Sequence, residues 1–394
     1  MLFIIGFQVT TQSKQVMLVV GEASGDIHGA HLVRALSGKD RTLRFFGVGG
    51  EQLERTNFEV LFNVSQLAGM GFVELAGSMR NIWRANRTLR QAMRERRPDL
   101  LVLIDFPEFN LRLAKLAKRL KIPVLFYISP QIWAWRRGRI RQIARCVDHM
   151  AVVFPFEVPL YEKWGVNVSF VGHPLLDIVR SRESREAVLA RLALDAKKQT
   201  IAILPGSRRG EISYHLPVLL DSALRLSQDL AVQFFVIRAS TVDRRELESM
   251  LGRVSLRIPM VDDERYDAVN ACDLAWAASG TATAETALLL KPMIIVYRLS
   301  WLTYALARMM VNVKHIGMVN IMAGKQVVPE LVQADFTAER LVKETRTLLE
   351  NPDQRERVVR KLISLREKLG TPGAADRVAN IAMSMMAQGS GVTL

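Results

Sequence analysis

The stretch DLLVLIDFPEFN (residues 99–110) joins an apolar run to an abrupt stop. Residues 100–104 are all Leu, Val or Ile, which is typical of a strand buried on both faces of a parallel sheet. The run ends at Asp105, and Phe106-Pro107 prevents the strand from continuing because proline has no N–H to donate. An Asp at this place is either an ordinary turn residue or a base that a rigid strand presents to a cleft.

Similar short runs recur along the chain and alternate with longer amphipathic stretches. They are QVMLVVG (15–21), RFFGVGG (44–50), DLLVLID (99–105), PVLFYIS (123–129), HMAVVF (149–154), TIAILPGS (200–207), VQFFVIRA (232–239), DLAWAASG (273–280) and PMIIVYR (292–298). This alternation predicts parallel strands joined by helical crossovers. The charged, helix-prone stretch 181–199 interrupts it, so we expect two doubly wound α/β domains that meet near 172–195.

The composition agrees with a globular chain of two domains. Its 394 residues are too many for one domain with a single hydrophobic core. Of these residues, 49% are hydrophobic and 24% are charged, as in globular proteins. Cys146 and Cys272 lie far apart without ligand spacing, which argues against a disulfide framework or a zinc site and fits a reducing compartment. The apolar stretch at 1–7 is too short for a membrane span and lacks the cationic flank of a signal peptide, so we expect a frayed extension.

The charge balance points to an anionic partner. There are 54 Lys and Arg against 39 Asp and Glu, a net charge of +15. Basic residues gather at 83–97 and 133–145, and the first cluster forms a stripe at helical spacing: Arg84, Arg87, Arg90, Arg94 and Arg97. Arginine beside Trp, Met and Leu is typical of a helix at a lipid headgroup surface, and LAGMGFVELAGSMRNIW (67–83) is the candidate contact. The alternative is an ordinary solvated helix face.

Ligands of doubly wound sheets bind beyond the carboxyl ends of strands, so the turns after the strands are candidate sites. In GEASGDIHGA (21–30), Ser24 or Asp26 can cap the helix that follows. In LPGSRRGEI (204–212), Gly206 and Ser207 expose backbone N–H groups and Arg208 adds a cation, which favours a phosphate site over a plain helix cap. Neither turn has the glycine spacing of a dinucleotide site or the Lys-Ser/Thr ending of a P-loop.

A third turn, AASGTATAETALL (277–289), is rich in hydrogen-bond donors. Ser279, Gly280 and Thr281 could hold a diphosphate while Glu285 accepts hydrogen bonds from sugar hydroxyls. The alternative is a helix of small residues packed on the sheet, with Glu285 in solvent. Because Asp105 and Arg208 follow strands of different halves, a cleft between the halves could hold both.

Eight motifs together resemble the lipid-A-disaccharide synthases. They are GEASGD (21–26), IDFPEFN (104–110), YISPQIWAWR (127–136), FPFE (154–157), GHPL (172–175), LPGSR (204–208), ASGTATAE (278–285) and NIMAG (320–324). The resemblance implies a GT-B glycosyltransferase, in which two Rossmann-like domains face a central cleft. It implies an inverting transfer that joins UDP-2,3-diacylglucosamine to 2,3-diacylglucosamine 1-phosphate and yields the β(1→6) lipid A disaccharide 1-phosphate and UDP.

The resemblance also implies roles for individual residues. Asp105 matches the family's essential acid, the candidate base, and Arg208 matches its essential arginine. Further residues would bind substrate from either domain: Glu22, Ser24, Asn110, Gly206, Ser207, Ser279, Gly280, Thr281, Glu285 and Asn320. The chain departs from the family pattern at Val319, where we expect proline, and this removes a fixed φ angle from the loop that carries Asn320.

We therefore expect three segments: an acceptor and lipid-binding domain over 1–175, a UDP-sugar domain over 176–345, and C-terminal helices over 346–394 that pack back on the first domain. No Asp-x-Asp motif is present, and VDDE (261–264) is read as a helix start, so we expect no metal and no cofactor. The expected location is cytoplasmic, peripheral on the inner face of the membrane, against anionic phospholipid and without nucleic acid. The alternatives are another UDP-sugar GT-B enzyme of cell-envelope synthesis, a UDP-sugar epimerase, or a nucleic-acid-binding protein.

Overall fold

The computed structural model describes residues 13–67, 75–130, 137–262, 264–301, 304 and 315–389. The chain forms two compact units, which are described separately: unit 1 is Met1–Pro174 with Pro372–Leu394, and unit 2 is Leu175–Thr371. The apolar N-terminal stretch, much of the candidate contact 67–83 and the tryptophans of 133–135 lie outside the described residues. Among the helices of the described ranges, none combines the length and the apolar character that crossing a bilayer requires.

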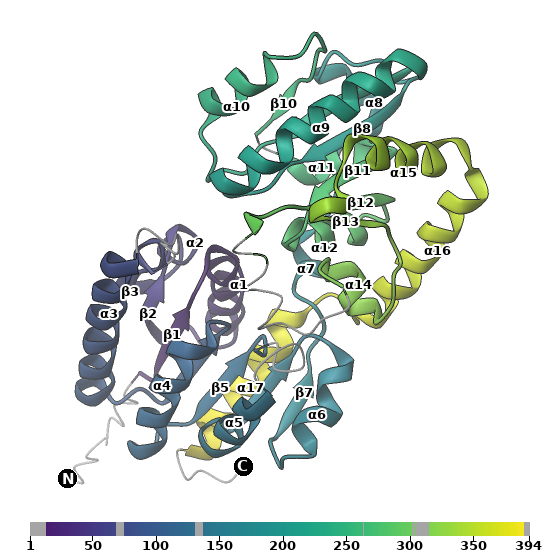
Figure 1. Cartoon of the computed structure of the whole chain (residues 1–394). Helices are drawn as coiled ribbons and strands as arrows, with labels where there is room; N and C mark the ends of the chain where they lie inside the picture. Colours follow the sequence, from purple (N-terminus) through teal and green to yellow (C-terminus); the bar gives the residue numbers. More distant parts are fainter. Residues whose placement is uncertain are drawn as a thin grey trace, which may run out of the picture. The chain divides into compact units, whose positions relative to one another are not determined.

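Unit 1 is built on a parallel sheet of seven strands in the order β3-β2-β1-β4-β5-β6-β7 (Figure 1). The strands are β1 (Gln15–Val20), β2 (Arg44–Gly49), β3 (Phe58–Asn63), β4 (Leu100–Ile104), β5 (Val124–Tyr127), β6 (His149–Val152) and β7 (Val168–Phe170). Every residue of β4 is fully buried, as its apolar sequence predicts. In the register of the two central strands, Val20 pairs with Ile104, so β1 and β4 end at the same level.

Helices connect these strands as crossovers. They are α1 (Ala23–Lys39), α2 (Glu51–Glu54), α3 (Leu75–Arg96), α4 (Pro107–Arg119), α5 (Ile140–Cys146) and α6 (Val158–Glu162). The last helix of the chain, α17 (Ala374–Gly389), also belongs to unit 1, where it contacts α1 and β4 (Figure 1, yellow). Two hydrogen bonds fasten it: Lys14 Nζ donates to Met386 O at 3.0 Å, and Arg377 Nε donates to Val171 O at 2.8 Å.

Unit 2 has a second parallel sheet, of six strands in the order β10-β9-β8-β11-β12-β13 (Figure 1). Its strands are β8 (Gln199–Leu204), β9 (Val232–Ile237), β10 (Met260–Val261), β11 (Leu274–Ala278), β12 (Met293–Tyr297) and β13 (Glu330–Val332). Its helices are α7 (Leu175–Ile178), α8 (Arg185–Arg191), α9 (Arg209–Asp229), α10 (Arg244–Leu251), α11 (Arg265–Ala271), α12 (Thr281–Leu288), α14 (Met318–Ala323), α15 (Ala338–Glu350) and α16 (Pro352–Lys368). The predicted fold class, two doubly wound parallel-sheet domains, is confirmed.

The unit boundary differs from the expected segments at the C-terminal side. Helices α15 and α16 belong to unit 2, and α15 packs on α9 of the same unit. The segment that we expected to return as a whole from residue 346 therefore changes unit only at Pro372. Short 3-10 helices complete the two units: η1 (Val64–Gln66), η2 (Arg137–Arg139), η3 (Pro155–Glu157) and η4 (Gln333–Asp335).

An aspartate just before a strand sets the register at the amino ends of both sheets. Asp99 accepts a hydrogen bond from Gln15 N at 2.8 Å, and Asp148 accepts one from Val124 N at 2.9 Å. In unit 2, Asp273 accepts one from a backbone N–H of β8, Thr200 N, at 2.8 Å. Each carboxylate satisfies a backbone donor that the sheet ladder leaves open where the strand begins. The candidate site lies at the other edge of each sheet, beyond the carboxyl ends of the strands.

Candidate active site

The strand order of unit 1 reverses between β1 and β4, because β2 lies on the other side of β1. Ligands of open α/β sheets bind at such a switch point, beyond the carboxyl ends of the two strands. The turn after β1 carries Glu22, which is exposed, and Ser24, which is partly exposed. The turn after β4 carries Asp105, which is partly buried. The structure thus brings these three predicted residues to one edge of one sheet.

The backbone after β4 takes an unusual path. Asp105 and Phe106 both have a positive φ, 51° and 48°, a left-handed conformation that non-glycine residues rarely adopt. Phe106 lies so close to the turn after β1 that a Cβ at Gly21 would come within 2.1 Å of the Phe106 Cβ, which explains the glycine there. The turn after β4 is therefore held against the turn after β1, and it orients Asp105 by backbone geometry.

Asn110, in the first turns of α4, stabilises this turn through its side-chain amide. Its side chain is fully buried, and its Nδ2 donates to Asp105 O at 2.6 Å and to Ile104 O at 3.3 Å. We expected Asn110 to line a substrate cleft, but both amide protons are used on backbone carbonyls. These contacts make Asn110 a positioning residue for the left-handed turn that carries Asp105, while its buried Oδ1 has no hydrogen-bond partner among the described residues.

The environment of Asp105 changes its acidity. Burial raises the pKa of the Asp105 carboxyl to about 6, the negative charge of Glu22 adds to the rise, and a hydrogen bond from the Phe106 backbone N–H opposes it. A carboxylate with a pKa near 6 is ionised at neutral pH, yet it is more basic than an ordinary Asp. Asp105 thus has the acidity that suits a general base.

The motif GEASGD serves a structural purpose that differs from the expected one. The N-cap of α1 is Glu22, and no side chain caps this helix, so the expectation that Ser24 or Asp26 caps it was wrong. The buried Asp26 carboxylate instead accepts hydrogen bonds from Gly50 N at 2.7 Å and Gln52 N at 2.8 Å at the start of α2. Asp26 therefore fixes the turn after β2 beside the switch point.

The buried histidines of unit 1 are neutral at physiological pH. Burial lowers the pKa of His28 to about 4 and that of His173 to about 3, and each is lowered further by a neighbouring imidazole, that of His31 and His28 respectively. His28 Nδ1 has no hydrogen-bond partner among the described residues. A protonated imidazole would lower the pKa of a nearby carboxyl group. Among the described residues, no imidazole contributes to the pKa of Asp105, which is therefore set by burial, by Glu22 and by the Phe106 N–H.

Unit 2 has an equivalent switch point between β8 and β11. The turn after β8 leads into α9, whose N-cap is Arg208. The Arg208 side chain is exposed and forms no ion pair with the described residues, whereas its neighbour Arg209 is paired with Glu246 at 2.8 Å. Among the described residues, Arg208 is therefore a cation available to a ligand at this strand end.

The backbone of this turn is occupied by an internal carboxylate. Glu211 Oε2 accepts hydrogen bonds from Ser207 N at 3.0 Å and from Arg208 N at 3.3 Å, so the expectation that the Ser207 N–H is open to phosphate was wrong. Gly206 has a φ of 127°, and a Cβ there would lie 2.7 Å from Glu211 Oε2. The glycine therefore makes room for the Glu211 cap. The third residue of a helix is the usual place for such a glutamate, a signal that the sequence carries at Glu211.

The turn after β11 lies beside the turn after β8, because the two strands are neighbours in the sheet. Gly280 and Thr281 are exposed at the start of α12, with Gly280 as the N-cap at a φ of 151°. No side chain caps this helix, so its first N–H groups face the strand end without a capping side chain. Ser279 Oγ donates to Ile316 O at 2.8 Å, which ties the turn to the segment before α14.

Glu285 is buried in α12 rather than exposed to solvent. Its Oε1 accepts hydrogen bonds from Arg265 Nη2 at 2.7 Å and from the Tyr266 hydroxyl at 3.1 Å. Burial raises the pKa of Glu285, while the charge of Arg265 and the hydrogen bond from Tyr266 oppose the rise. The alternative of a solvated Glu285 is thus wrong, and no pattern in the sequence marks its partners, Arg265 and Tyr266, as part of the site.

Asn320 lies in α14 and is fully buried. Its Nδ2 donates to Val328 O at 2.9 Å and to Glu330 Oε1 at 2.8 Å, and its Oδ1 accepts from Val327 N at 2.6 Å and from Val328 N at 3.1 Å. The amide therefore has no donor or acceptor left for a nucleotide or sugar, the contact that the resemblance implied.

Val319, which stands where the family pattern has proline, is the second residue of α14 and is fully buried. A backbone N–H in the first turn of a helix has no partner within the helix, so proline is tolerated there. The hydrogen bonds of Asn320 hold this segment without it. The missing proline therefore does not leave the segment unsupported.

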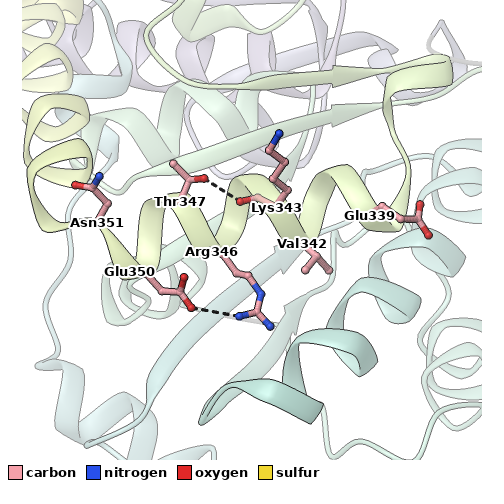
Figure 2. A pocket seen from close by; sticks show the side chains of 7 residues that line it. All are labelled: Glu339, Val342, Lys343, Arg346, Thr347, Glu350 and Asn351. Atoms are coloured by element: carbon pink, nitrogen blue, oxygen red, sulfur yellow. Dashed lines mark hydrogen bonds and ion pairs between the residues drawn. The ribbon is translucent and has the colours of Figure 1, made fainter.

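A surface groove of about 510 Å³ lies elsewhere in unit 2, along α15. Figure 2 shows the side chains that line it: Glu339, Val342, Lys343, Arg346, Thr347, Glu350 and Asn351. Arg346 pairs with Glu350 at 3.3 Å, and Thr347 Oγ1 donates to Lys343 O at 3.0 Å. None of the lining residues is a predicted site residue, and these contacts are those of a solvated helix face.

Comparison with known proteins assigns the family. A family model described as lipid-A-disaccharide synthetase matches residues 16–381. The chain belongs to this family. The lipid-A-disaccharide synthase of Geobacter sulfurreducens is 46% identical over 375 residues, which are 95% of this chain and 98% of that protein. The enzyme of the same name from Syntrophus aciditrophicus is 45% identical over 376 residues, with the same coverage of each chain.

Solved structures support the GT-B fold. A glycosyltransferase of kitacinnamycin superposes with a TM-score of 0.64 at 14% identity, covering 95% of this chain and 100% of that chain. The UDP-GlcNAc 2-epimerase from Neisseria meningitidis, bound to UDP-GlcNAc, superposes with a TM-score of 0.61 at 14% identity, covering 94% and 100%. At such low identity the likeness concerns the fold. Because the family and the curated relatives are lipid-A-disaccharide synthases, the other GT-B enzymes and the epimerase are not favoured, and the chain is a glycosyltransferase of lipid A synthesis.

Proposed function

We propose that this lipid-A-disaccharide synthase uses its two switch points for different substrates. The switch point of unit 1 binds the acceptor, 2,3-diacylglucosamine 1-phosphate, and the switch point of unit 2 binds the donor, UDP-2,3-diacylglucosamine. The observation that carries the proposal is the different chemistry of the two sheet edges. One presents a carboxyl group with a pKa raised to about 6, and the other presents an exposed arginine beside an uncapped helix start.

In this proposal Asp105 is the general base. The acceptor 6-hydroxyl attacks the anomeric carbon of the donor, the bond from that carbon to the UDP oxygen breaks, and Asp105 takes the hydroxyl proton. A single displacement of this kind inverts the anomeric configuration and gives the β(1→6) linkage. A positioned base typically contributes roughly 10²–10⁴ in rate. The left-handed backbone at Asp105 supports this role because it sets the direction in which the side chain leaves the turn.

Arg208 and the turn at 279–281 bind the diphosphate in this proposal. Negative charge grows on the UDP oxygen as the bond breaks, and a guanidinium together with a helix N-terminus stabilises that charge. Glu285, held by Arg265 and Tyr266, accepts hydrogen bonds from the ribose hydroxyls through its other carboxylate oxygen. These groups need no metal ion for the charge that they stabilise.

The pH dependence of turnover tests the state of Asp105. A base with a pKa of about 6 loses its function below that pH, so kcat/KM should fall roughly tenfold per pH unit on the acid side. Glu22→Gln removes a negative charge that raises this pKa, so the acid limb of the profile should move to lower pH. The measurement is kcat/KM between pH 4.5 and 8 for both proteins, and an acid limb that stays in place would argue against Asp105 as the titrating base.

Product analysis tests the proposed reaction as a whole. The protein is incubated with both acylated sugars without added metal, and UDP and the disaccharide 1-phosphate are quantified. We expect equimolar release of UDP and formation of a β(1→6) disaccharide. An epimerised donor, or UDP release without disaccharide, would contradict the proposal and support a different reaction at the same UDP site.

We further propose that α3 brings unit 1 to the anionic inner leaflet of the cytoplasmic membrane. Its apolar side is buried through Leu89 and Met93, while the arginines of the opposite side are exposed: Arg84, Arg87, Arg90 and Arg94. The fifth predicted arginine, Arg97, lies beyond the helix end. Trp83 is 62% exposed, and the Arg87 guanidinium lies 5.7 Å from the centroid of its ring. An exposed tryptophan among cations suits a headgroup surface, beneath which the acyl chains of both substrates would lie.

Vesicle binding tests this surface. Replacing Arg84, Arg87 and Arg94 together by Gln should weaken binding to anionic vesicles by more than about a hundredfold, since each cation contributes about 1 kcal/mol. The control replaces three exposed cations of α16, Arg357, Lys361 and Lys368, and should bind like the wild type. Equal binding of the α3 variant and the wild type would overturn the proposal.

A further inference from the structure

We propose that Glu330 is a positioning residue for donor binding. It acts through the segment 316–320, which its carboxylate holds in place and which in turn fixes Ser279 at the start of the proposed diphosphate turn. The inference rests on the proposed role of the turn at 279–281 in binding UDP. Glu330 is the first residue of β13, and nothing in its sequence context marks it as part of the site.

The Glu330 carboxylate accepts several hydrogen bonds in a largely buried position. Its side chain is 10% exposed. Oε2 accepts from Ile316 N at 3.1 Å, and Oε1 accepts from Gly317 N at 3.0 Å and from Asn320 Nδ2 at 2.8 Å. The imidazole of His315, 4.0 Å away, is the only basic group paired with it among the described residues. A buried carboxylate with this set of donors binds the segment more strongly than neutral acceptors would.

The same segment fixes the turn after β11. Ile316, whose N–H donates to Glu330, accepts a hydrogen bond from Ser279 Oγ at its carbonyl, at 2.8 Å. The backbone N–H of Ser279 donates to Val296 O at 3.1 Å, so this residue is held from two sides. The N–H of the Ile316–Gly317 peptide unit, which is that of Gly317, donates to Glu330 Oε1, and the carbonyl of the same unit accepts from Ser279 Oγ. A continuous chain of hydrogen bonds therefore runs from Glu330 through one peptide unit to the residue that precedes Gly280 and α12.

The chemistry of the network requires a carboxylate. All the groups that face Glu330 here are N–H donors, and an ionised carboxylate offers only acceptors. A glutamine would turn its NH₂ group toward at least one of these N–H groups. Glu330→Gln therefore loses a hydrogen bond and the charge with almost no change in side-chain volume, which makes it the sharpest test.

The experiment measures UDP affinity by titration calorimetry and the KM values of both substrates. We expect Glu330→Gln to weaken UDP binding and raise the donor KM by about tenfold or more, the loss typical of hydrogen bonds to a charged group, while the acceptor KM stays unchanged. Ser279→Ala should weaken UDP binding as well. Because both changes break the same chain of contacts, the double variant should bind UDP no more weakly than Glu330→Gln alone.

A matched control separates positioning from loss of stability. Trp276 Nε1 donates to Thr345 Oγ1 at 3.0 Å in the core of unit 2, and Thr345→Val removes this buried bond away from the segment 316–320. It should lower the melting temperature without changing UDP affinity. If Glu330→Gln does not fold, Ser279→Ala alone must both weaken UDP binding and speed amide hydrogen exchange at 316–317.

The outcomes distinguish this inference from the proposed function. Equal UDP affinity of Glu330→Gln and the wild type, or additive losses in the double variant, would overturn the positioning role while leaving the donor site intact. A wild-type protein that does not bind UDP would overturn the donor assignment itself. An equal rise of the KM values of donor and acceptor would indicate a general structural loss and contradict the inference.

Discussion

Asp105→Asn should lower kcat at least about a hundredfold, because asparagine cannot take the proton of the acceptor hydroxyl. The change is nearly isosteric, so the backbone should be preserved. The left-handed turn depends on the Asn110 amide, which bonds to the carbonyls of Ile104 and Asp105 rather than to the Asp105 carboxylate. Asparagine is also among the residues that best tolerate a positive φ. The loss should therefore appear in turnover and not in folding, measured as the rate of disaccharide formation at saturating substrates.

Asp99→Asn provides a matched control for this prediction. Asp99 lies at the opposite end of the same strand, where its carboxylate accepts from Gln15 N at 2.8 Å. The substitution removes a charge from unit 1 and weakens a hydrogen bond at the amino end of the sheet. We expect a lower melting temperature with kcat within about threefold of the wild type, since structural losses of this kind stay outside the chemistry. Near-wild-type turnover of Asp105→Asn would end the assignment of the base.

Arg208→Ala should also lower turnover at least about a hundredfold, by removing the cation that stabilises charge on the departing UDP. Its guanidinium is exposed, so the substitution costs little packing. The Glu211 cap accepts from the backbone N–H of Arg208, which alanine retains, so α9 should begin at the same residue. Arg208→Lys should recover part of the loss, because lysine restores the charge without the planar fork of the guanidinium.

Arg209→Ala is the control for this second prediction. Arg209 is adjacent in sequence and equally cationic, but its side chain is 85% exposed and paired with Glu246 on α10. Its loss removes the same charge from the protein, so both variants share any effect of net charge. We expect Arg209→Ala to retain turnover within about twofold, in line with the small contribution of exposed ion pairs. Equal losses at the two positions would show that Arg208 acts only through the overall charge.

The sequence predicted the centre of each sheet better than its edges. Every apolar run that we selected forms a strand, whereas β3, β7, β10 and β13 were not predicted. These are the outermost strands of the two sheets. A central parallel strand is covered on both faces and appears as a continuous apolar run, while an edge strand is partly exposed, as β3 is, or short, as β7, β10 and β13 are. β10, with two residues, illustrates this limit.

The positions of the candidate site followed from the same reasoning, because parallel strands end at one edge of a sheet. Which way each side chain faces did not follow. Asn110 and Asn320 were expected to contact substrate, but both are fully buried and bond to the backbone that carries the site. A motif indicates which residue type stands at a position. It does not distinguish a residue that contacts substrate from one that stabilises the backbone of the turn at the site.

Long-range partners were the other feature that the sequence did not reveal. Glu330, in β13, accepts hydrogen bonds from residues 316–320 only when unit 2 is folded. Arg265, in α11, bonds to Glu285 of another helix, α12. By contrast, Glu211 caps its own helix three residues from the N-cap, a local signal that could have been used. Local hydrogen bonds are predictable from spacing, whereas those between distant elements require the fold.

The central claim is that acceptor chemistry belongs to unit 1 and UDP binding to unit 2. The most direct test is the Kd of UDP for Asp105→Asn and Arg208→Ala, measured by titration calorimetry beside the wild type. The account predicts wild-type affinity for Asp105→Asn, although it turns over at least about a hundredfold more slowly, and affinity weakened by about tenfold or more for Arg208→Ala. UDP affinity lost equally in both variants, or lost only in Asp105→Asn, would contradict it.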